Sequence, residues 1–271
     1  MALRLNTLLS IAGSDPLGGA GIQADIKAAA SCGVHAMTAL TSVTVQNSRN
    51  FIDLGILSPK TLKNQLEVII EDVIPDAIKI GMIGSIQNLL VIEEFLNKVP
   101  DVPVVIDPIL KSTISAKSLC EGEEEYKEKI KENLFPKATV ITPNYSEFIK
   151  MGGSPNFREE EPADILASFN TNAIIITGVE NKTNNSISDY LIHGDEITHV
   201  SHKKKECINL HGTGCVYSTL MACFLSKGAP LDNAFYSVSN KINEIINKSC
   251  NYSLGDSKYG PLNILDYTWR S

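Results

Sequence analysis

Short apolar runs alternate with longer amphipathic segments along most of the chain, and this alternation limits the possible folds more than any other feature. The short runs are typical of buried strands, and the amphipathic segments are typical of helices. Because the strands are joined through helices and are apolar almost throughout, the pattern predicts an α/β protein with parallel central strands covered on both faces. We expect strands at residues 8–12, 37–45, 77–80, 102–106, 138–141 and 173–177, and helices at 20–31, 61–73, 87–96, 213–226 and 231–248.

The connectivity changes after residue 185. Residues 186–192 and 196–200 flank His193-Gly194-Asp195, which predicts a short hairpin instead of another crossover. The charged stretch at 121–132 is typical of a solvated helix face, although its Glu-rich start could also form a mobile flap. No change of composition marks a boundary, so we expect a single domain over residues 1–271.

The charge balance argues for a small-molecule partner. With 24 Lys and Arg against 31 Asp and Glu, the net charge is −7, and no basic surface is expected that would bind nucleic acid or an anionic membrane. The N-terminus lacks the pattern of a secretory signal, and no apolar run reaches the length of a membrane span. We therefore expect a soluble, cytoplasmic protein whose six cysteines, which include no C-x-x-C pair, are free thiols.

The segment His211-Gly-Thr-Gly-Cys215 precedes a strongly apolar helical segment. Gly212 and Gly214 around Thr213 would let the unpaired N–H groups of a helix start approach an anion, and the expected ligand is a phosphate. Cys215 would lie in the first turn, where the same field favours the thiolate and makes the side chain a base or nucleophile. Two alternatives stay open: a tight turn with Cys215 as a small core residue, and a weak metal pair of His211 with Cys215.

A second glycine-rich segment, residues 13–25, lies between the first strand and the first helix and is typical of a ligand-binding loop. Residues 19–24 match the Gly-x-Gly-x-x-Ala dinucleotide pattern, but the match starts several residues beyond the strand. The second strand ends in Gln46-Asn-Ser instead of the acidic residue that binds a ribose, which argues against nicotinamide. A Walker A loop is excluded because no Gly-Lys-Ser/Thr follows.

Several short motifs occur in one order along the chain. They are Ser10-Ile-Ala-Gly-Ser-Asp-Pro with Gly-Gly-Ala-Gly-Ile-Gln-Ala-Asp25, Val45-Gln-Asn47, Lys79-Ile-Gly-Met82, Ile106-Asp-Pro108, Ile141-Thr-Pro-Asn-x-x-Glu147, His211-Gly-Thr-Gly-Cys215 and Gly260-Pro-Leu-Asn263. Together they resemble the hydroxymethylpyrimidine/phosphomethylpyrimidine kinases of thiamine biosynthesis, and the resemblance spans nearly the whole chain. It implies a ribokinase-like three-layer α/β/α sandwich with a mostly parallel central sheet, ATP and Mg2+ as cofactors, and a homodimer.

The resemblance assigns five residues to the pyrimidine substrate. Asp25 would accept from the exocyclic amine, and Gln46 would both donate to and accept from the ring edge. Met82 would press its thioether on the ring face, and Gly13 and Ala20 would let the ring approach the backbone. The alternatives are an exposed helix acid for Asp25, a strand-end cap for Gln46 and a core position for Met82.

The resemblance also assigns the groups that transfer the phosphoryl group. Gly212, Thr213 and Gly214 would form the anion hole around its oxygens. Cys215 would take the proton from the CH2–OH group of the substrate. Because phosphoryl transfer depends mostly on positioning and charge neutralisation, losing Cys215 should reduce kcat more than binding.

Mg2+ and nucleotide positions follow from the same resemblance. Asp107 and Glu147 would orient Mg2+ directly or through water, and Asn144 would lie beside the nucleotide. The Asn144-x-x-Glu147 spacing is also that of a helix capping box, and both roles can hold together. The motif Thr177-Gly178-Val-Glu stands where relatives carry a lysine near the phosphates, and Lys111 is expected to supply the missing charge.

The leading hypothesis is an ATP- and Mg2+-dependent kinase. It would phosphorylate the hydroxymethyl group of 4-amino-5-hydroxymethyl-2-methylpyrimidine and then its monophosphate. Two alternatives remain: a pyridoxine or pyridoxal kinase of the same superfamily, and a non-catalytic pyrimidine-binding protein that has kept the pocket without phosphoryl transfer.

Overall fold

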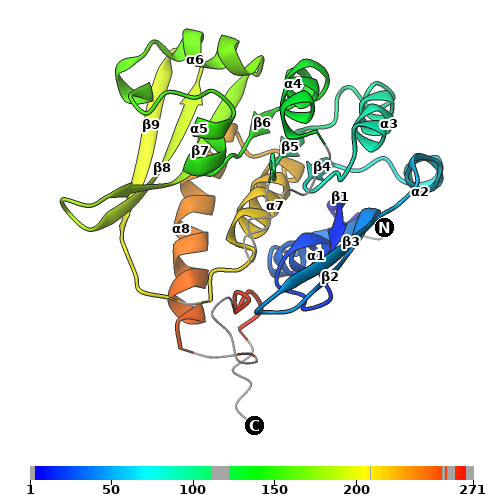
Figure 1. Cartoon of the computed structure of the whole chain (residues 1–271), viewed down its shortest axis with the longest axis horizontal. Coiled ribbons are helices and arrows are strands. Elements are labelled where there is room, and N and C mark those ends of the chain that lie inside the picture. Colours follow the sequence, from blue (N-terminus) through cyan, green and yellow to red (C-terminus); the bar gives the residue numbers. More distant parts are fainter. Residues whose placement is uncertain (1–3, 111–121, 208, 252–253, 255–259, 267–271) are drawn as a thin grey trace.

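A nine-stranded sheet forms the centre of the described part of the chain, in the order β3-β2-β1-β4-β5-β6-β7-β8-β9 (Figure 1). The computed structural model describes residues 4–110, 122–207, 209–251, 254 and 260–266. The six neighbouring strands β2, β1, β4, β5, β6 and β7 are parallel to one another. Strand β3 at one end of the sheet and strands β8 and β9 at the other end pair antiparallel. The strands are β1 (Thr7–Ser14), β2 (His35–Gln46), β3 (Phe51–Ile56), β4 (Ala77–Ile80), β5 (Val104–Ile106), β6 (Val140–Ile141), β7 (Ala173–Asn181), β8 (Ser186–His193) and β9 (Glu196–Lys203).

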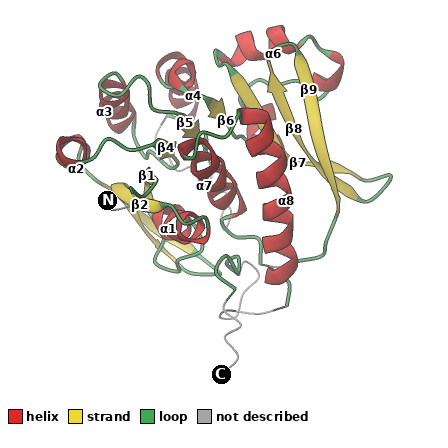
Figure 2. Ribbon diagram, turned by 180° about the vertical axis from the view of Figure 1, so that it is seen from behind, coloured by secondary structure: helices red, strands yellow, loops and turns green. Residues whose placement is uncertain are grey.

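Helices form the two outer layers, which Figures 1 and 2 show from opposite sides. Helices α1, α7 and α8 cover one face of the sheet, and α2 to α6 cover the other. This arrangement confirms the three-layer α/β/α architecture. The helices are α1 (Gly21–Ser31), α2 (Pro59–Asp72), α3 (Ile86–Leu96), α4 (Glu123–Asn133), α5 (Tyr145–Lys150), α6 (Pro162–Phe169), α7 (Thr213–Ser226) and α8 (Leu231–Ser249).

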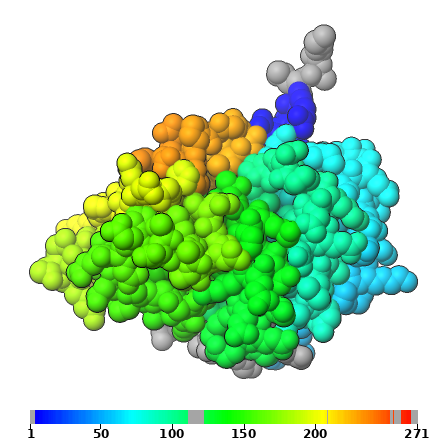
Figure 3. Space-filling view, turned by 90° about the horizontal axis from the view of Figure 1, so that it is seen from above, coloured from blue at the N-terminus to red at the C-terminus, as the bar shows by residue number. Residues whose placement is uncertain are grey.

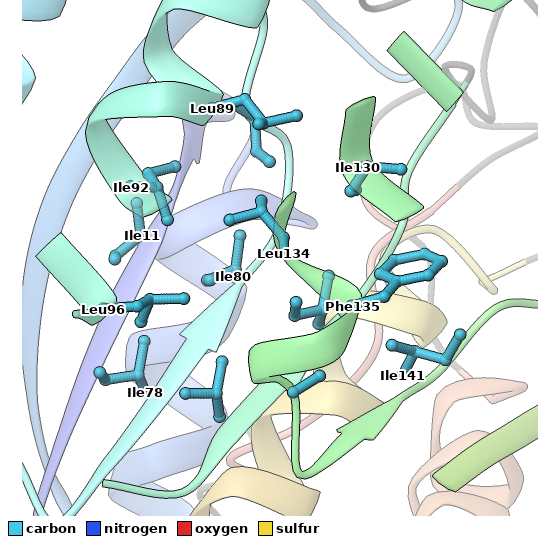
Figure 4. Close-up of a cluster of buried hydrophobic side chains, with 14 of the residues drawn as sticks. Ile11, Ile78, Ile80, Leu89, Ile92, Leu96, Ile130, Leu134, Phe135 and Ile141 are labelled. Carbon is cyan, nitrogen blue, oxygen red and sulfur yellow. The ribbon is translucent and has the colours of Figure 1, made fainter. Parts of the chain in front are cut away.

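The core divides into two clusters because successive residues of a strand point to opposite faces. In β1, Leu8 packs toward α1, α7 and α8, whereas Leu9 packs toward the other helices. Figure 4 shows the second cluster, where α3 and the segment after α4 meet the sheet. In Figure 3, α2 and α3 (cyan) and the segment of α4 to α6 (green) lie side by side over this layer. Because helices cover both faces of the sheet, its central strands are buried on both sides and are apolar almost throughout.

The sequence pattern missed one hairpin. Asn47 Oδ1 accepts from the backbone N–H groups of Arg49 and Asn50, which turns the chain after β2 into the antiparallel strand β3. The turn residues and the alternation in Phe51–Ile56 were the available signal. The expected hairpin of β8 and β9 is confirmed. The charged stretch predicted at 121–132 forms helix α4 over the residues that the structure describes. Within the described chain, no helix combines the length and apolarity needed to span a membrane.

Candidate active site

The candidate site lies at the carboxyl edge of the parallel strands. Gly13 lies at the end of β1, Met82 follows β4, Asp107 follows β5 and Asn144 follows β6. The N-terminus of α7, which begins at Thr213, approaches the same edge, because an added Cβ on Gly214 would lie 3.6 Å from Asp107 Oδ2. Parallel sheets bind ligands at this edge, and the structure therefore brings separate motifs of the sequence together there.

The backbone conformation at the start of α7 requires a glycine at position 212. It is the N-cap residue with φ of +83°, and an added Cβ would lie 1.8 Å from the carbonyl oxygen of Gly19. Gly212 has no side chain that could cap this helix start, which leaves the N–H groups there suited to an anion. Thr213 Oγ1 donates to the carbonyl of Leu210 at 2.8 Å, and the backbone N–H of Thr213 donates to the same carbonyl at 3.3 Å, so both groups of Thr213 hold the turn before α7.

Replacing Gly212 by alanine is expected to destabilise the protein and abolish phosphoryl transfer. Gly228 is a matched control because it also has positive φ, +76°, but an added Cβ there meets nothing within 4 Å. Gly228→Ala should cost only the left-handed backbone strain, about 1–2 kcal/mol. Gly212→Ala adds a backbone collision, so urea unfolding should show a clearly larger loss. Equal losses for the two variants would contradict the close packing of Gly212 against Gly19.

Cys215 is buried, and its thiol is protonated at neutral pH. Burial raises its pKa to about 12, the Asp107 and Asp25 carboxylates add to this rise, and the Lys79 ammonium opposes it. The expectation of a thiolate is therefore wrong for the protein without ligands, because burial outweighs the field of the helix start. The backbone N–H of Gly21 bonds to the thiol, which places Cys215 next to the glycine-rich loop. Its role as the base stays a prediction.

Gly13 and Met82 lie in contact at the carboxyl edge of the sheet. A Cβ on Gly13 would lie 2.2 Å from Met82 Cε, so only glycine fits here without displacing the thioether. Met82 packs with Phe51 in a small cluster separate from the two main core clusters, which sets it apart from an ordinary core methionine. Gln46 ends β2 opposite Phe51, and Ala20 is the N-cap residue of α1. These positions are compatible with the predicted ring contacts, which stay predictions.

Asp25 does not lie on an exposed helix face, and that alternative is wrong. Its side chain is fully buried, and Lys79 Nζ donates to both of its oxygens at 3.1 and 2.9 Å. Ser10 Oγ and Thr219 Oγ1 donate to the same carboxylate at 2.6 and 2.8 Å. Both oxygens of Asp25 are therefore occupied by hydrogen bonds to buried side chains in this structure. A bond to the pyrimidine amine would need a rearrangement of this network.

Asp107 and Glu147 form a buried acidic pair suited to a cation. Burial raises the pKa of Asp107 to about 6, with Asp25 adding to the rise and Lys79 and Ser218 opposing it. Burial also raises the pKa of Glu147 to about 8, and repulsion from Asp107 contributes. A divalent cation would relieve this repulsion. Among the described residues no cluster of three His, Cys, Asp or Glu could hold a metal, but Mg2+ keeps several waters and needs few protein ligands.

Asn144 and Glu147 form the expected capping box. Asn144 Oδ1 accepts from the backbone N–H of Glu147 at 2.9 Å, and Glu147 Oε2 accepts from that of Asn144 at 3.0 Å. This role is confirmed, whereas the nucleotide and metal roles of the two residues stay predictions. Thr177 forms a bridge with Asn144, and Gly178 donates to Asp189 Oδ1 at 3.0 Å, so both lie at the same edge. Lys111 lies outside the described residues.

The sequence analysis missed the polar partners beneath the site. Lys79 interrupts the apolar strand β4, and a lysine there needs a buried acid, which was the available signal. His211 Nε2 lies 3.1 Å from Asp15 Oδ2, so His211 pairs with an acid of the first glycine-rich loop. The weak alternative of a metal shared by His211 and Cys215 gains no support. Ser218 Oγ donates to Asp107 Oδ2 at 3.3 Å from the second turn of α7.

The comparisons with known proteins agree with this geometry. A family model described as phosphomethylpyrimidine kinase matches residues 15–263. The chain belongs to this family. A hydroxymethylpyrimidine/phosphomethylpyrimidine kinase of Staphylococcus aureus (strain Mu50) is 31% identical over 265 residues, which cover 96% of this chain and 93% of the relative. The described strand order and the solved relatives below confirm the ribokinase-like fold.

Two solved structures are similar to the chain over most of its length. A phosphomethylpyrimidine kinase from Clostridium difficile 630 superposes with a TM-score of 0.74 at 29% identity, covering 88% of this chain and 98% of that one. The pyridoxal kinase from Staphylococcus aureus in complex with AMP-PCP and pyridoxal superposes with a TM-score of 0.83 at 25% identity, covering 98% and 96%. A pyrimidine kinase and a pyridoxal kinase are therefore both among the structural relatives of this chain.

Proposed function

We propose that the protein is an ATP-dependent kinase that phosphorylates the hydroxymethyl group of 4-amino-5-hydroxymethyl-2-methylpyrimidine and then its monophosphate. One observation carries the proposal: the uncapped start of α7, Cys215 and Asp107 meet at one sheet edge, beside the contact of Gly13 with Met82. Family membership and the names of the relatives support the pyrimidine as the acceptor.

In the proposed reaction, the backbone N–H groups of Gly212 and Gly214 bind the oxygens of the transferring phosphoryl group and stabilise their charge. Cys215 first loses its own proton to solvent, and the resulting thiolate then accepts the proton of the substrate hydroxyl as the oxygen attacks phosphorus. Mg2+, when bound, neutralises phosphate charge, and Asp107 and Glu147 would hold it with water completing its shell. The nearby Lys79 ammonium favours the loss of the Cys215 proton, because its positive charge stabilises the thiolate and lowers the pKa of the thiol.

A vitamin B6 kinase is the second candidate. The observation that favours it is the superposition on the pyridoxal kinase complex, which covers more of the chain than the superposition on the Clostridium difficile enzyme. The pyrimidine branch is better supported, because the family model and the curated relative carry that name.

ADP release with MgATP tests the proposal, with hydroxymethylpyrimidine, its monophosphate and pyridoxal offered separately. Turnover of both pyrimidines is expected. Turnover of pyridoxal alone would transfer the protein to the B6 kinases. Calorimetric binding of the pyrimidine without any ADP release would favour the non-catalytic alternative.

The dependence on Mg2+ is expected to vary with pH. A carboxyl group must lose its proton to bind Mg2+, and the pKa values of Asp107 and Glu147 are raised to about 6 and about 8. The Mg2+ concentration giving half-maximal rate should therefore fall as the pH rises from 6 to 8. In the variant Glu147→Gln, the Mg2+ concentration giving half-maximal rate should change little with pH above 7. An unchanged Mg2+ requirement across this range would contradict the proposed metal site.

We also propose that the protein is a homodimer, as the resemblance implies. The hairpin of β2 and β3 supports this, because Val43, Val45 and Ile52 are 45%, 48% and 63% exposed at the end of the sheet. A second copy would remove this apolar surface from water. Sedimentation velocity should show a dimer, and Ile52→Glu should shift it toward the monomer. A monomeric native protein would contradict this proposal.

A further inference from the structure

The loop between β1 and α1 is folded around the carboxylate of Asp15. Its Oδ1 accepts from the backbone N–H of Leu17 at 2.9 Å, and its Oδ2 accepts from those of Gly19 and Ala20 at 3.0 and 2.9 Å. Burial by itself would raise the pKa of Asp15, but these bonds and His211 outweigh it and hold the pKa below its usual range. The carboxylate therefore fixes the backbone of the loop that leads into Ala20.

His211 reaches the same carboxylate from a loop 196 residues further along the chain. Its Nε2 lies 3.1 Å from Asp15 Oδ2, and the two side chains are 5% and 2% exposed. The ring also packs against the loop, because a Cβ on Gly19 would lie 2.6 Å from His211 Cδ2. On its other side, the backbone N–H of His211 donates to the carbonyl of Gly260 at 3.1 Å. A buried carboxylate and imidazole in this geometry form a strong, charge-assisted contact.

The two loops also touch through their backbones. Gly212 follows His211 directly, and its Cα approaches the Gly19 carbonyl so closely that a Cβ would lie 1.8 Å from the oxygen. Neither loop can shift without separating a buried polar pair and opening this backbone contact. Such a separation leaves buried polar groups without partners, which is costly.

We propose that Asp15 and His211 are a positioning pair, which fixes the distance between the loop that holds the alcohol substrate and the α7 amides that hold the phosphoryl group. The assignment of what each loop holds rests on the proposed function. Both oxygens of Asp15 are occupied by the loop and by His211, so the pair acts through other groups and touches no reacting atom. In-line transfer depends on this distance, and a misplacement of about 1 Å can cost about 100-fold in rate.

Hydrogen exchange measured by mass spectrometry tests the coupling without any need for activity. His211→Ala is expected to speed exchange of the amides of residues 17–20, and Asp15→Asn is expected to speed exchange of those of residues 211–216. Each substitution is thus expected to speed exchange in the loop that does not carry it. His193→Ala is the matched control, because His193 is an exposed histidine at the turn of β8 and β9, paired with Asp232. It should leave both loops unchanged.

Kinetics of the alcohol accepted by the wild-type enzyme test the positioning role. His211→Ala should lower kcat about 10- to 100-fold, with each KM changed less than about threefold, because the geometry of transfer is lost. The variant His211→Gln, whose amide nitrogen can occupy the place of Nε2, should recover most of the rate. A role in stability alone would lower the melting temperature and leave kcat of the folded fraction unchanged.

Two results would overturn the proposal: exchange that changes only in the loop carrying the substitution, or transmitted exchange with unchanged kcat in His211→Ala. Where His211→Ala does not fold, Asp15→Asn carries the same measurements, with His211→Gln as the variant that keeps the contact. If the wild-type protein phosphorylates none of the alcohols, the proposed function fails. The exchange experiment then still decides whether the two loops are coupled.

Discussion

Replacing Lys79 by methionine is expected to lower the free energy of unfolding by about 3–5 kcal/mol, because the change leaves a buried carboxylate without its cation. Lys79 and Asp25 are both fully buried, 2.9 Å apart, and the pair lies between β4 and α1 beneath the candidate site. Burial lowers the pKa of Lys79, but Asp25, Cys215 and Asp107 together outweigh burial and raise it, so the lysine is charged at any working pH. Urea unfolding monitored by circular dichroism measures the loss.

Two further variants separate the buried charge from simple packing. In the double variant Lys79→Met with Asp25→Asn no unpaired charge remains, so it should recover at least half of the lost stability. Lys63→Met is the matched surface control, since Lys63 pairs with Glu94 at 2.8 Å with both side chains largely in water. Lys63→Met should leave the free energy of unfolding nearly unchanged. A double variant no more stable than Lys79→Met would show that packing, and not charge, decides the effect.

Replacing Cys215 by alanine is expected to lower kcat for the pyrimidine alcohol by about 100- to 10,000-fold, the range for a lost general base. The KM values should change little, because the proton is taken only as the hydroxyl attacks. The anion hole of Gly212 and Gly214 is backbone and survives the substitution. Steady-state ADP release gives both constants.

Cys223→Ala is the control, because Cys223 lies two turns later on α7, buried in the core and away from the sheet edge. Its kcat should stay near that of the wild type. At saturating Mg2+, kcat should rise with pH across the neutral range, since the Cys215 thiol with a pKa of about 12 must lose its proton. Cys215→Ser should lose this rise. A wild-type kcat that is independent of pH, with an active Cys215→Ala, would remove Cys215 from the role of base.

The architecture was largely predictable, because burial on both faces leaves a strong mark on short strands. The strands around Ile78, Val105 and Val140 were found from their apolar runs, and the hairpin of β8 and β9 from its Gly-Asp turn. The hairpin strand β3 was missed, since it is only six residues long and most of its side chains are exposed, which makes its alternation a weak signal. The short helices α5 and α6 were missed for a similar reason, because one or two turns give too little periodicity.

The candidate site was predictable as a set of motifs but not as a set of protonation states. The motifs placed Gly13, Met82, Asp107 and Gly214 near one another, and the structure agrees. The sequence suggested a thiolate at Cys215, whereas burial keeps the thiol protonated. A helix start is visible in a sequence, but the depth at which it is buried is not.

The sequence by itself determined the order of the buried strands and the longer helices, the glycine-rich segments of the site, and the family. These properties depend on local patterns, which neighbouring residues carry. Only the tertiary structure decided the polar pairs beneath the site, Lys79 with Asp25 and His211 with Asp15, whose members are 54 and 196 residues apart. Such pairs form because the fold removes both groups from water, so that each must find its hydrogen-bond partners inside the protein, a condition that no local pattern contains.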